Sequence, residues 1–157
     1  MAQRTEPSPL KSVLKKGPKK PKFKKEGRGF ITLDSGAEES VWPQSWIPSI
    51  PTKPAKVERK FAAANGTPLI HYGEKVVPFQ TEDSAIASVK FQVTDVIKPL
   101  VSVKRIIERG NTVSFGATAA ECFIQNISSG KRIHFRPHGG SFVLDVEFLS
   151  MDFHRQA

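Results

Sequence analysis

The sequence contains a single cysteine and no long apolar run. Cys122 has no second cysteine with which to form an internal disulfide, and there is no cysteine cluster to bind zinc. Without a basic partner to activate its thiol, Cys122 is expected to be a buried, unreactive side chain. No apolar stretch approaches the roughly 20 residues of a membrane-spanning helix, and the first residues do not resemble a secretory signal. We therefore expect a soluble, cytoplasmic or nuclear protein that is not secreted and has no membrane partner.

Acidic residues are scarce at the start of the chain. Residues 1–29 hold 10 basic and 2 acidic side chains, a net charge of +8, whereas the remainder holds 14 basic and 13 acidic. With four prolines and little apolar content, this segment is predicted to be a disordered basic tail. Such a tail favours nonspecific, salt-sensitive contact with nucleic acid or another polyanion, or nuclear targeting. A solvated linker from a longer polyprotein is the alternative.

From residue 30 onward, short apolar stretches alternate with Pro, Gly and Asn, which is typical of an all-β domain. The length of 157 residues fits one domain. The predicted strands are residues 30–33, 75–79, 88–94, 112–115, 121–126, 132–135 and 141–148. One short helix is predicted at residues 101–109, where Gly110 stops it, and the prolines in 43–56 predict a loop. Trp42 and Trp46 are expected to cover one edge of the core.

The tetrapeptide Asp34-Ser35-Gly36-Ala37 places a carboxylate where an apolar run ends. Two such carboxylates held close together cannot both ionise, so they share one proton and can hold a water between them. Ser35 offers a hydroxyl that can fix the loop, and Gly36 permits unusual backbone angles and close approach of a second chain. Taken alone, the same residues also suit an ordinary tight turn.

A second motif is Asn65-Gly66, between residues 60–64 and 68–72. Asn-Gly is a strong hairpin signal, because both residues tolerate the positive φ of tight turns. The small residues before it suggest a mobile arm. An ordinary surface hairpin is the alternative.

In these motifs the chain resembles the retroviral-like aspartic proteases (retropepsins), in particular the protease segment of copia-type retrotransposon polyproteins. The resemblance covers about residues 30–148. It is carried by residues 33–37, 41–43, 64–66, 72–73, 99–103 and 110–115 in that order, and more loosely by 130–133 and 139–145. The stretch Leu100-Val101-Ser102 follows the copia-type pattern and departs from viral proteases, in which a hydrophobic pair and a glycine precede the helix.

The resemblance implies a retropepsin-like closed β-barrel or sandwich with one short helix, working as a homodimer. It divides the chain into the basic tail (1–29), a protease domain (30–118) and a C-terminal β extension like the segment before integrase (119–157). Asp34, Ser35 and Gly36 are then the candidate catalytic residues, and Ala64, Asn65, Gly66 and Thr67 form the flap. These residues would hydrolyse peptide bonds of a polyprotein with an activated water, without metal or cofactor.

Two other hypotheses stay open at the level of sequence. The chain could be a catalytically idle, protease-like interaction protein that binds nucleic acid or another polyanion through its tail. It could also be a fragment of a longer polyprotein. Glu38 and Glu39 add negative charge near the motif if they face inward. His134 and His138 have a metal-like spacing, but a third ligand at a persuasive spacing is missing, so a metal site is not expected.

Overall fold

The structure is a computed structural model, and it describes residues 22–152. Strands make up 50% of it. In chain order they are β1 (Phe23–Asp34), β2 (Val41–Pro43), β3 (Phe61–Ala62), β4 (Pro68–Leu69), β5 (Gly73–Thr81), β6 (Ile86–Thr94), β7 (Leu100–Ser102), β8 (Asn111–Ser114), β9 (Phe123–Asn126), β10 (Arg132–His134), β11 (Arg136–His138) and β12 (Ser141–Met151). The helical segments in this range are α1 (Val103–Glu108) and a 3₁₀ turn, η1 (Ala119–Glu121).

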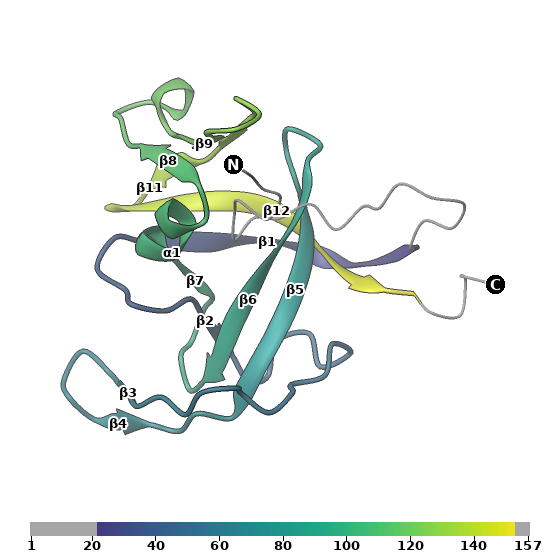
Figure 1. Cartoon of the computed structure of the whole chain (residues 1–157), viewed down its shortest axis with the longest axis vertical. Helices are drawn as coiled ribbons and strands as arrows, with labels where there is room; N and C mark the ends of the chain where they lie inside the picture. Colours follow the sequence, from purple (N-terminus) through teal and green to yellow (C-terminus); the bar gives the residue numbers. More distant parts are fainter. Residues whose placement is uncertain (1–21, 153–157) are drawn as a thin grey trace.

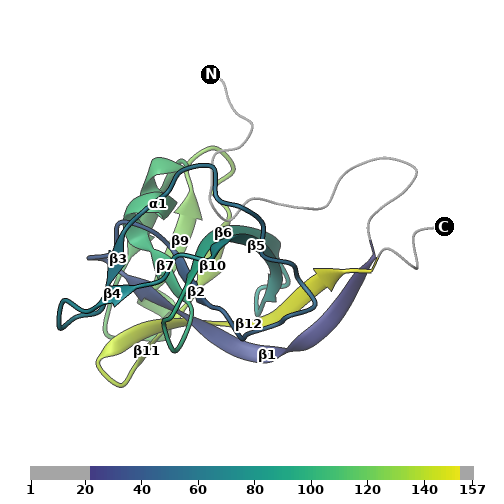
Figure 2. The same ribbon diagram turned by 90° about the horizontal axis from the view of Figure 1, so that it is seen from below.

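Six strands close into a barrel (Figures 1 and 2). Their order is β1-β7-β2-β6-β5-β12, and β12 pairs back onto β1. The β1–β7 and β2–β6 pairs are parallel, whereas β5–β6, β5–β12 and β1–β12 are antiparallel. Strand β11 extends the sheet through its hairpin with β12. The expected mostly-β fold, with a closed barrel and one short α-helix in the described part of the chain, is confirmed.

Large apolar side chains fill the barrel interior. Val89, Phe91 and Val93 of β6 are at most 1% exposed, as the alternation of this segment predicted. Trp42 is fully buried and contacts Phe91 and Phe148, with ring centroids 5.0 and 5.4 Å away. Each such side chain contributes roughly 1.5–3 kcal/mol through burial. Trp42 is therefore a central core residue and does more than cover an edge.

Strand β1 begins at Phe23, seven residues earlier than the sequence predicted. Residues 23–29 pair with the end of β12, with Phe23 opposite Met151, and a bulge between Lys25 and Gly27 shifts the register. The two strands run as a long ribbon that reaches beyond the barrel (Figure 2). The prediction of disorder is therefore wrong for residues 23–29, and the rest of the predicted tail, residues 1–21, lies outside the described residues.

Helix α1 begins at Val103, two residues later than predicted. Residues 100–102 form strand β7 instead, because Leu100 and Val101 lie opposite Thr32 and Leu33 of β1. Ser102 then caps the helix: its side-chain oxygen accepts a hydrogen bond from the backbone N–H of Arg105 at 3.2 Å. The segment that looked like the first helical turn is thus the strand beside the one that ends at Asp34.

The predicted division at residues 118 and 119 falls within one structural unit. Strand β8 pairs with β9 across this point, in the three-stranded sheet β10-β9-β8. Strand β12, from the predicted extension, is a barrel strand. The three-part division of the chain stays a prediction about likeness to other sequences. Within residues 22–152, no helix has the length and apolar character needed to cross a bilayer.

Candidate active site

Asp34 is the last residue of β1, and the loop of residues 34–40, called here the Asp34 loop, turns away from the barrel at this point. One carboxylate oxygen, Oδ1, accepts a hydrogen bond from the backbone N–H of Gly36 at 2.9 Å. The other makes no hydrogen bond with the described residues, and the side chain is half-buried. Asp34 is thus held at one oxygen and open at the other.

The structure is compatible with the role expected for Ser35 but not with the backbone conformation expected for Gly36. The Ser35 side chain is exposed and bonds to none of the described residues, so its hydroxyl is open to a partner. Gly36 does not have a positive φ, so the expected need for a special backbone conformation is wrong. A Cβ at Gly36 would lie 3.6 Å from Asp34 Oδ1, an ordinary contact. Close approach of a second chain is the role that stays possible for this glycine.

Ser102, the N-cap of α1, is hydrogen-bonded to the Asp34 loop at two points. The Ser102 hydroxyl donates to the Ala37 carbonyl at 2.7 Å, and the Ser102 N–H donates to Ser40 Oγ at 3.0 Å. Ser102 is fully buried and Ser40 is 4% exposed, so both bonds lie away from solvent. A buried polar group costs free energy unless it is paired, and here each group is paired across the loop–helix junction. The loop that carries Asp34 is therefore fixed to the barrel.

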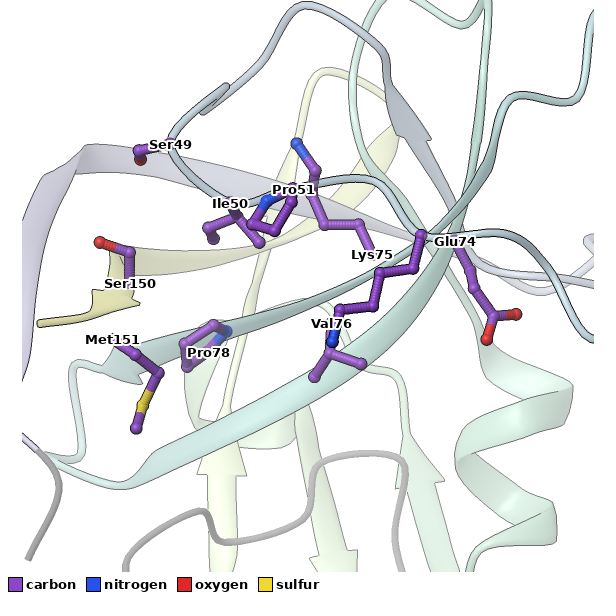
Figure 3. Close-up of a pocket in the computed structure, with 10 residues that line it drawn as sticks. Ser49, Ile50, Pro51, Glu74, Lys75, Val76, Pro78, Ser150 and Met151 are labelled. Atoms are coloured by element: carbon purple, nitrogen blue, oxygen red, sulfur yellow. The ribbon is translucent and has the colours of Figure 1, made fainter. Parts of the chain in front are cut away.

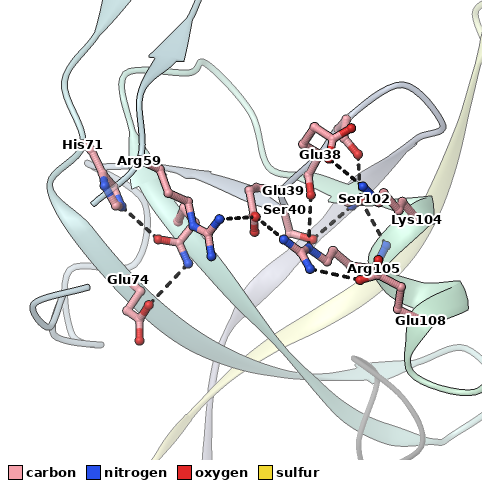
Figure 4. Close-up of polar contacts among 12 residues, drawn as sticks. Glu38, Glu39, Ser40, Arg59, His71, Glu74, Ser102, Lys104, Arg105 and Glu108 are labelled. Carbon is pink, nitrogen blue, oxygen red and sulfur yellow. Dashed lines mark hydrogen bonds and ion pairs between the residues drawn. The ribbon is translucent and has the colours of Figure 1, made fainter. Parts of the chain in front are cut away.

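Glu38 and Glu39 each form an ion pair with a cation of α1 (Figure 4). Lys104 Nζ donates to Glu38 Oε1 at 2.7 Å, which lowers the pKa of the Glu38 carboxyl and raises the pKa of Lys104. The Arg105 guanidinium binds Glu39 Oε2 and, at 3.1 Å, the Glu38 carbonyl. The bond to Glu39 raises the pKa of Arg105. These contacts neutralise the two acids beside the motif.

A cavity of about 610 Å³ opens beside Asp34. Its wall includes Leu100, Phe115 and Phe142, and Lys98 lies at the same opening. Thr32, two residues before Asp34 on the same face of β1, also lines it. The Thr32 hydroxyl is buried and has no hydrogen-bond partner among the described residues. The cavity thus offers apolar surface with a carboxylate and a free hydroxyl, the combination typical of a binding site.

The predicted flap residues form the tip of the β3–β4 hairpin, which projects from the same side of the barrel as the Asp34 loop (Figure 1). Ala64, Asn65, Gly66 and Thr67 are all exposed. Asn65 Oδ1 accepts from the Thr67 N–H at 3.0 Å, and the Ala63 N–H donates to the Thr67 carbonyl at 2.8 Å. Of these four residues, Gly66 alone has a positive φ, of 86°.

A second, smaller cavity of about 230 Å³ lies along β5 (Figure 3). The carboxylate and the hydroxyls that line it are paired within the protein, and Glu74 accepts from Gln92 Nε2 at 3.3 Å. The ammonium of Lys75 donates to the carbonyls of Trp46 and Ile47, each at 3.1 Å, and burial lowers the pKa of Lys75. Ser49 and Ser150 both donate to Glu26. Because the carboxylate and hydroxyls among its described lining residues are all paired, the Asp34 cavity is the better candidate site.

Four residues that support the Asp34 loop were not predicted from sequence: Ser102, Lys104, Arg105 and Arg59. The local signal was Ser102, a residue type that is preferred at a helix N-cap. The two histidines lie in separate contacts: His134 pairs with Asp83 at 3.6 Å, and His138 packs on Phe30. Cys122 is fully buried, as expected, and its thiol donates to the Gly116 carbonyl at 3.3 Å.

Comparison with known proteins returned no likeness: no family model, curated protein or solved structure matches the chain. The case for a function therefore rests on the residues and their geometry.

Proposed function

We propose that the chain is an aspartic endopeptidase of the retropepsin-like class that works as a homodimer. The observation that carries the proposal is the geometry of Asp34. It ends a barrel strand, keeps one carboxylate oxygen free and faces a cavity that is large enough for a peptide side chain. The order of the sequence motifs supports the same conclusion, and a polyprotein of the retrotransposon type is the proposed substrate.

The chemistry requires a second chain. Among the described residues, Asp34 is the only carboxylate that lines the cavity, and the sequence contains one Asp-Ser-Gly. One carboxylate can accept a proton from water, but an electrophilic partner is needed to polarise the scissile carbonyl. Two Asp34 side chains meeting at a two-fold axis supply both roles, because the pair shares a proton. The ionised member activates the water and the protonated member donates to the carbonyl oxygen, without a covalent intermediate.

Three features of the surroundings support this arrangement. The exposed Ser35 hydroxyl is free to bond across the axis. Leu100, Phe115 and Phe142 offer an apolar wall to a substrate side chain next to the scissile bond. The β3–β4 hairpin is exposed on the side of the Asp34 loop, where it could cover an extended peptide and exclude water.

The test compares the purified full chain with Asp34→Asn, using its own extended precursor or a peptide library at mildly acidic pH. Asparagine keeps an oxygen that can accept from the Gly36 N–H, so the loop should fold as before. We expect cleavage to fall by at least about 100-fold, the scale of one lost acid–base group. Glu82→Gln, an exposed change of the same charge on the β5–β6 turn, is the matched control and should cleave normally.

Cleavage that persists in Asp34→Asn would contradict the assignment. Solution mass over a range of concentrations, with and without substrate, tests the second requirement, since an obligate two-chain site needs a dimer. A chain that stays monomeric and cleaves nothing would instead favour the idle interaction protein. In that case, the salt dependence of nucleic-acid binding by the full chain becomes the informative measurement.

A further inference from the structure

The two legs of the β3–β4 hairpin are attached to the rest of the molecule in different ways. The C-terminal leg, residues 70–72, is bonded to β6 and the residue after it at several points. Tyr72 N–H donates to the Val93 carbonyl at 2.9 Å, and Thr94 Oγ1 donates to the Ile70 carbonyl at 2.7 Å. Tyr72 Oη donates to Asp95 at 2.8 Å. This leg is an extension of the barrel.

The N-terminal leg, residues 54–60, follows Lys53, which exchanges two backbone hydrogen bonds of 2.8 Å with Glu74 of β5, and beyond that point it has fewer attachments. Among the described residues, one polar contact joins it to the barrel side of the molecule: Arg59 Nη1 lies 2.7 Å from Glu39 Oε2. Strands β3 and β4 form a two-stranded sheet of their own, which is separate from the barrel sheet. Between the backbone anchor at Lys53 and the start of β3, the polar attachment of this leg among the described residues is therefore this ion pair.

The acceptor of that ion pair belongs to the Asp34 loop. Glu39 Oε2 is shared between Arg59, from the hairpin leg, and Arg105, from α1 (Figure 4). The Glu39 side chain is 13% exposed, and the Arg59 side chain is 34% exposed. A pair this shielded is screened by salt less than a fully exposed one. The Glu39 carboxylate thus links the β3–β4 hairpin and helix α1 to the Asp34 loop.

We infer that Arg59 is a positioning residue, whose ion pair with Glu39 latches the hairpin to the Asp34 loop. The catalytic part of this inference rests on the proposed peptidase function, in which the hairpin covers the substrate. Loss of Arg59 leaves Glu39 paired with Arg105, so no buried charge is stranded and the barrel stays folded. The consequence should be a hairpin that opens more often over an unchanged loop.

Amide hydrogen exchange on the full chain tests the latch without any need for activity. In Arg59→Gln, exchange at the Ala63 and Gly66 amides should rise roughly two- to fivefold, the range for a partly exposed pair. Arg59→Lys keeps a cation and should show a smaller rise. Lys60→Gln removes the neighbouring exposed cation and should change nothing. Unchanged hairpin exchange in Arg59→Gln, or an equal rise across β5 and β6, would overturn the inference.

The kinetic test uses the same variants in the dimeric enzyme. A loosened cover should raise KM about two- to fivefold and leave kcat nearly unchanged, because the carboxylates stay in place. A loss confined to kcat would mean that Arg59 acts on the Asp34 loop itself and would overturn the positioning role. Faster amide exchange in the hairpin with unchanged kcat and KM would overturn the link to catalysis. Failure of the Asp34→Asn test would remove the proposed activity, and the exchange result would still decide the latch.

Discussion

The Asp34 loop and the β3–β4 hairpin lie on the same side of one barrel, yet they are held very differently. The loop is bonded to α1 and β7 through Ser102, Lys104 and Arg105. The hairpin consists of two strands of two residues each, with an exposed tip. The loop is a fixed platform, whereas the hairpin is a cover held firmly at residues 70–72 and more loosely at residues 54–60. A site that must hold an acid steadily and still admit a long substrate needs both properties.

The largest difference in unfolding free energy is expected between alanine substitutions at two glycines of the β3–β4 hairpin and its connection to β5. Gly73, where the arm joins β5, has φ of 142°, and a Cβ there would lie 2.2 Å from the Lys53 carbonyl oxygen. Gly73→Ala should therefore cost about 3 kcal/mol of unfolding free energy. Gly66, at the tip, also has a positive φ but faces open space. Gly66→Ala should cost about 1 kcal/mol locally and leave the global denaturant midpoint in place.

Denaturant unfolding and amide exchange measure both effects. If Gly66→Ala lowered the global midpoint as much as Gly73→Ala does, the tip would be part of the cooperative barrel. The contrast between platform and cover would then be lost.

Removal of one support tests the platform directly. Ser102→Ala deletes the helix cap and the bond to the Ala37 carbonyl, and should cost about 1–2 kcal/mol of unfolding free energy. Ser114→Ala is the matched control, because its hydroxyl donates to the Glu121 carbonyl at 2.9 Å on an exposed face, far along the chain from the loop. Urea unfolding should show the smaller loss for Ser114→Ala. Equal stability of the two variants would mean that the loop does not depend on Ser102.

The smallest effect is expected from pH. Because Lys104 lowers the pKa of Glu38 in the folded state below 4.5, the contribution of this pair is present above that value and is lost as pH falls through the lowered pKa. The difference in urea midpoint between the natural chain and Glu38→Gln should therefore be largest near neutral pH and shrink on acidification through the lowered pKa. A difference that grew on acidification would contradict the pairing. The pair should accordingly survive the mildly acidic conditions of the cleavage assay.

The parts of the fold that follow from local pattern were predictable from sequence. The alternation of Val89, Phe91 and Val93 located β6, and the apolar run before Asp34 located the end of β1. Strand β7 was missed because residues 100–102 are strand only through pairing with β1 and β2, which lie far away in sequence. The first half of β1 was missed for a similar reason. Its charged residues are typical of a tail, and only their pairing with β12 makes them a strand.

The candidate site divides in the same way. Asp34 and the hairpin tip were found because Asp-Ser-Gly and Asn-Gly have local conformational preferences. The roles of Arg59 and Arg105 were not found, because the ion pairs they form with Glu39 span 20 and 66 residues of sequence. Local preference thus locates a reactive group, and tertiary contact determines what holds it.

The pairing of Phe23 with Met151 places the two ends of the described chain side by side, at the end of the β1–β12 ribbon that reaches beyond the barrel. The fold therefore depends more on which strands lie side by side than on the order in which the chain connects them. A short bridge between those two residues would let the backbone be opened elsewhere, for example in the turn at residues 82–84, while the strand ladders stay intact. For the same reason, the whole unit could be spliced into a surface loop of a larger host without pulling its ends apart.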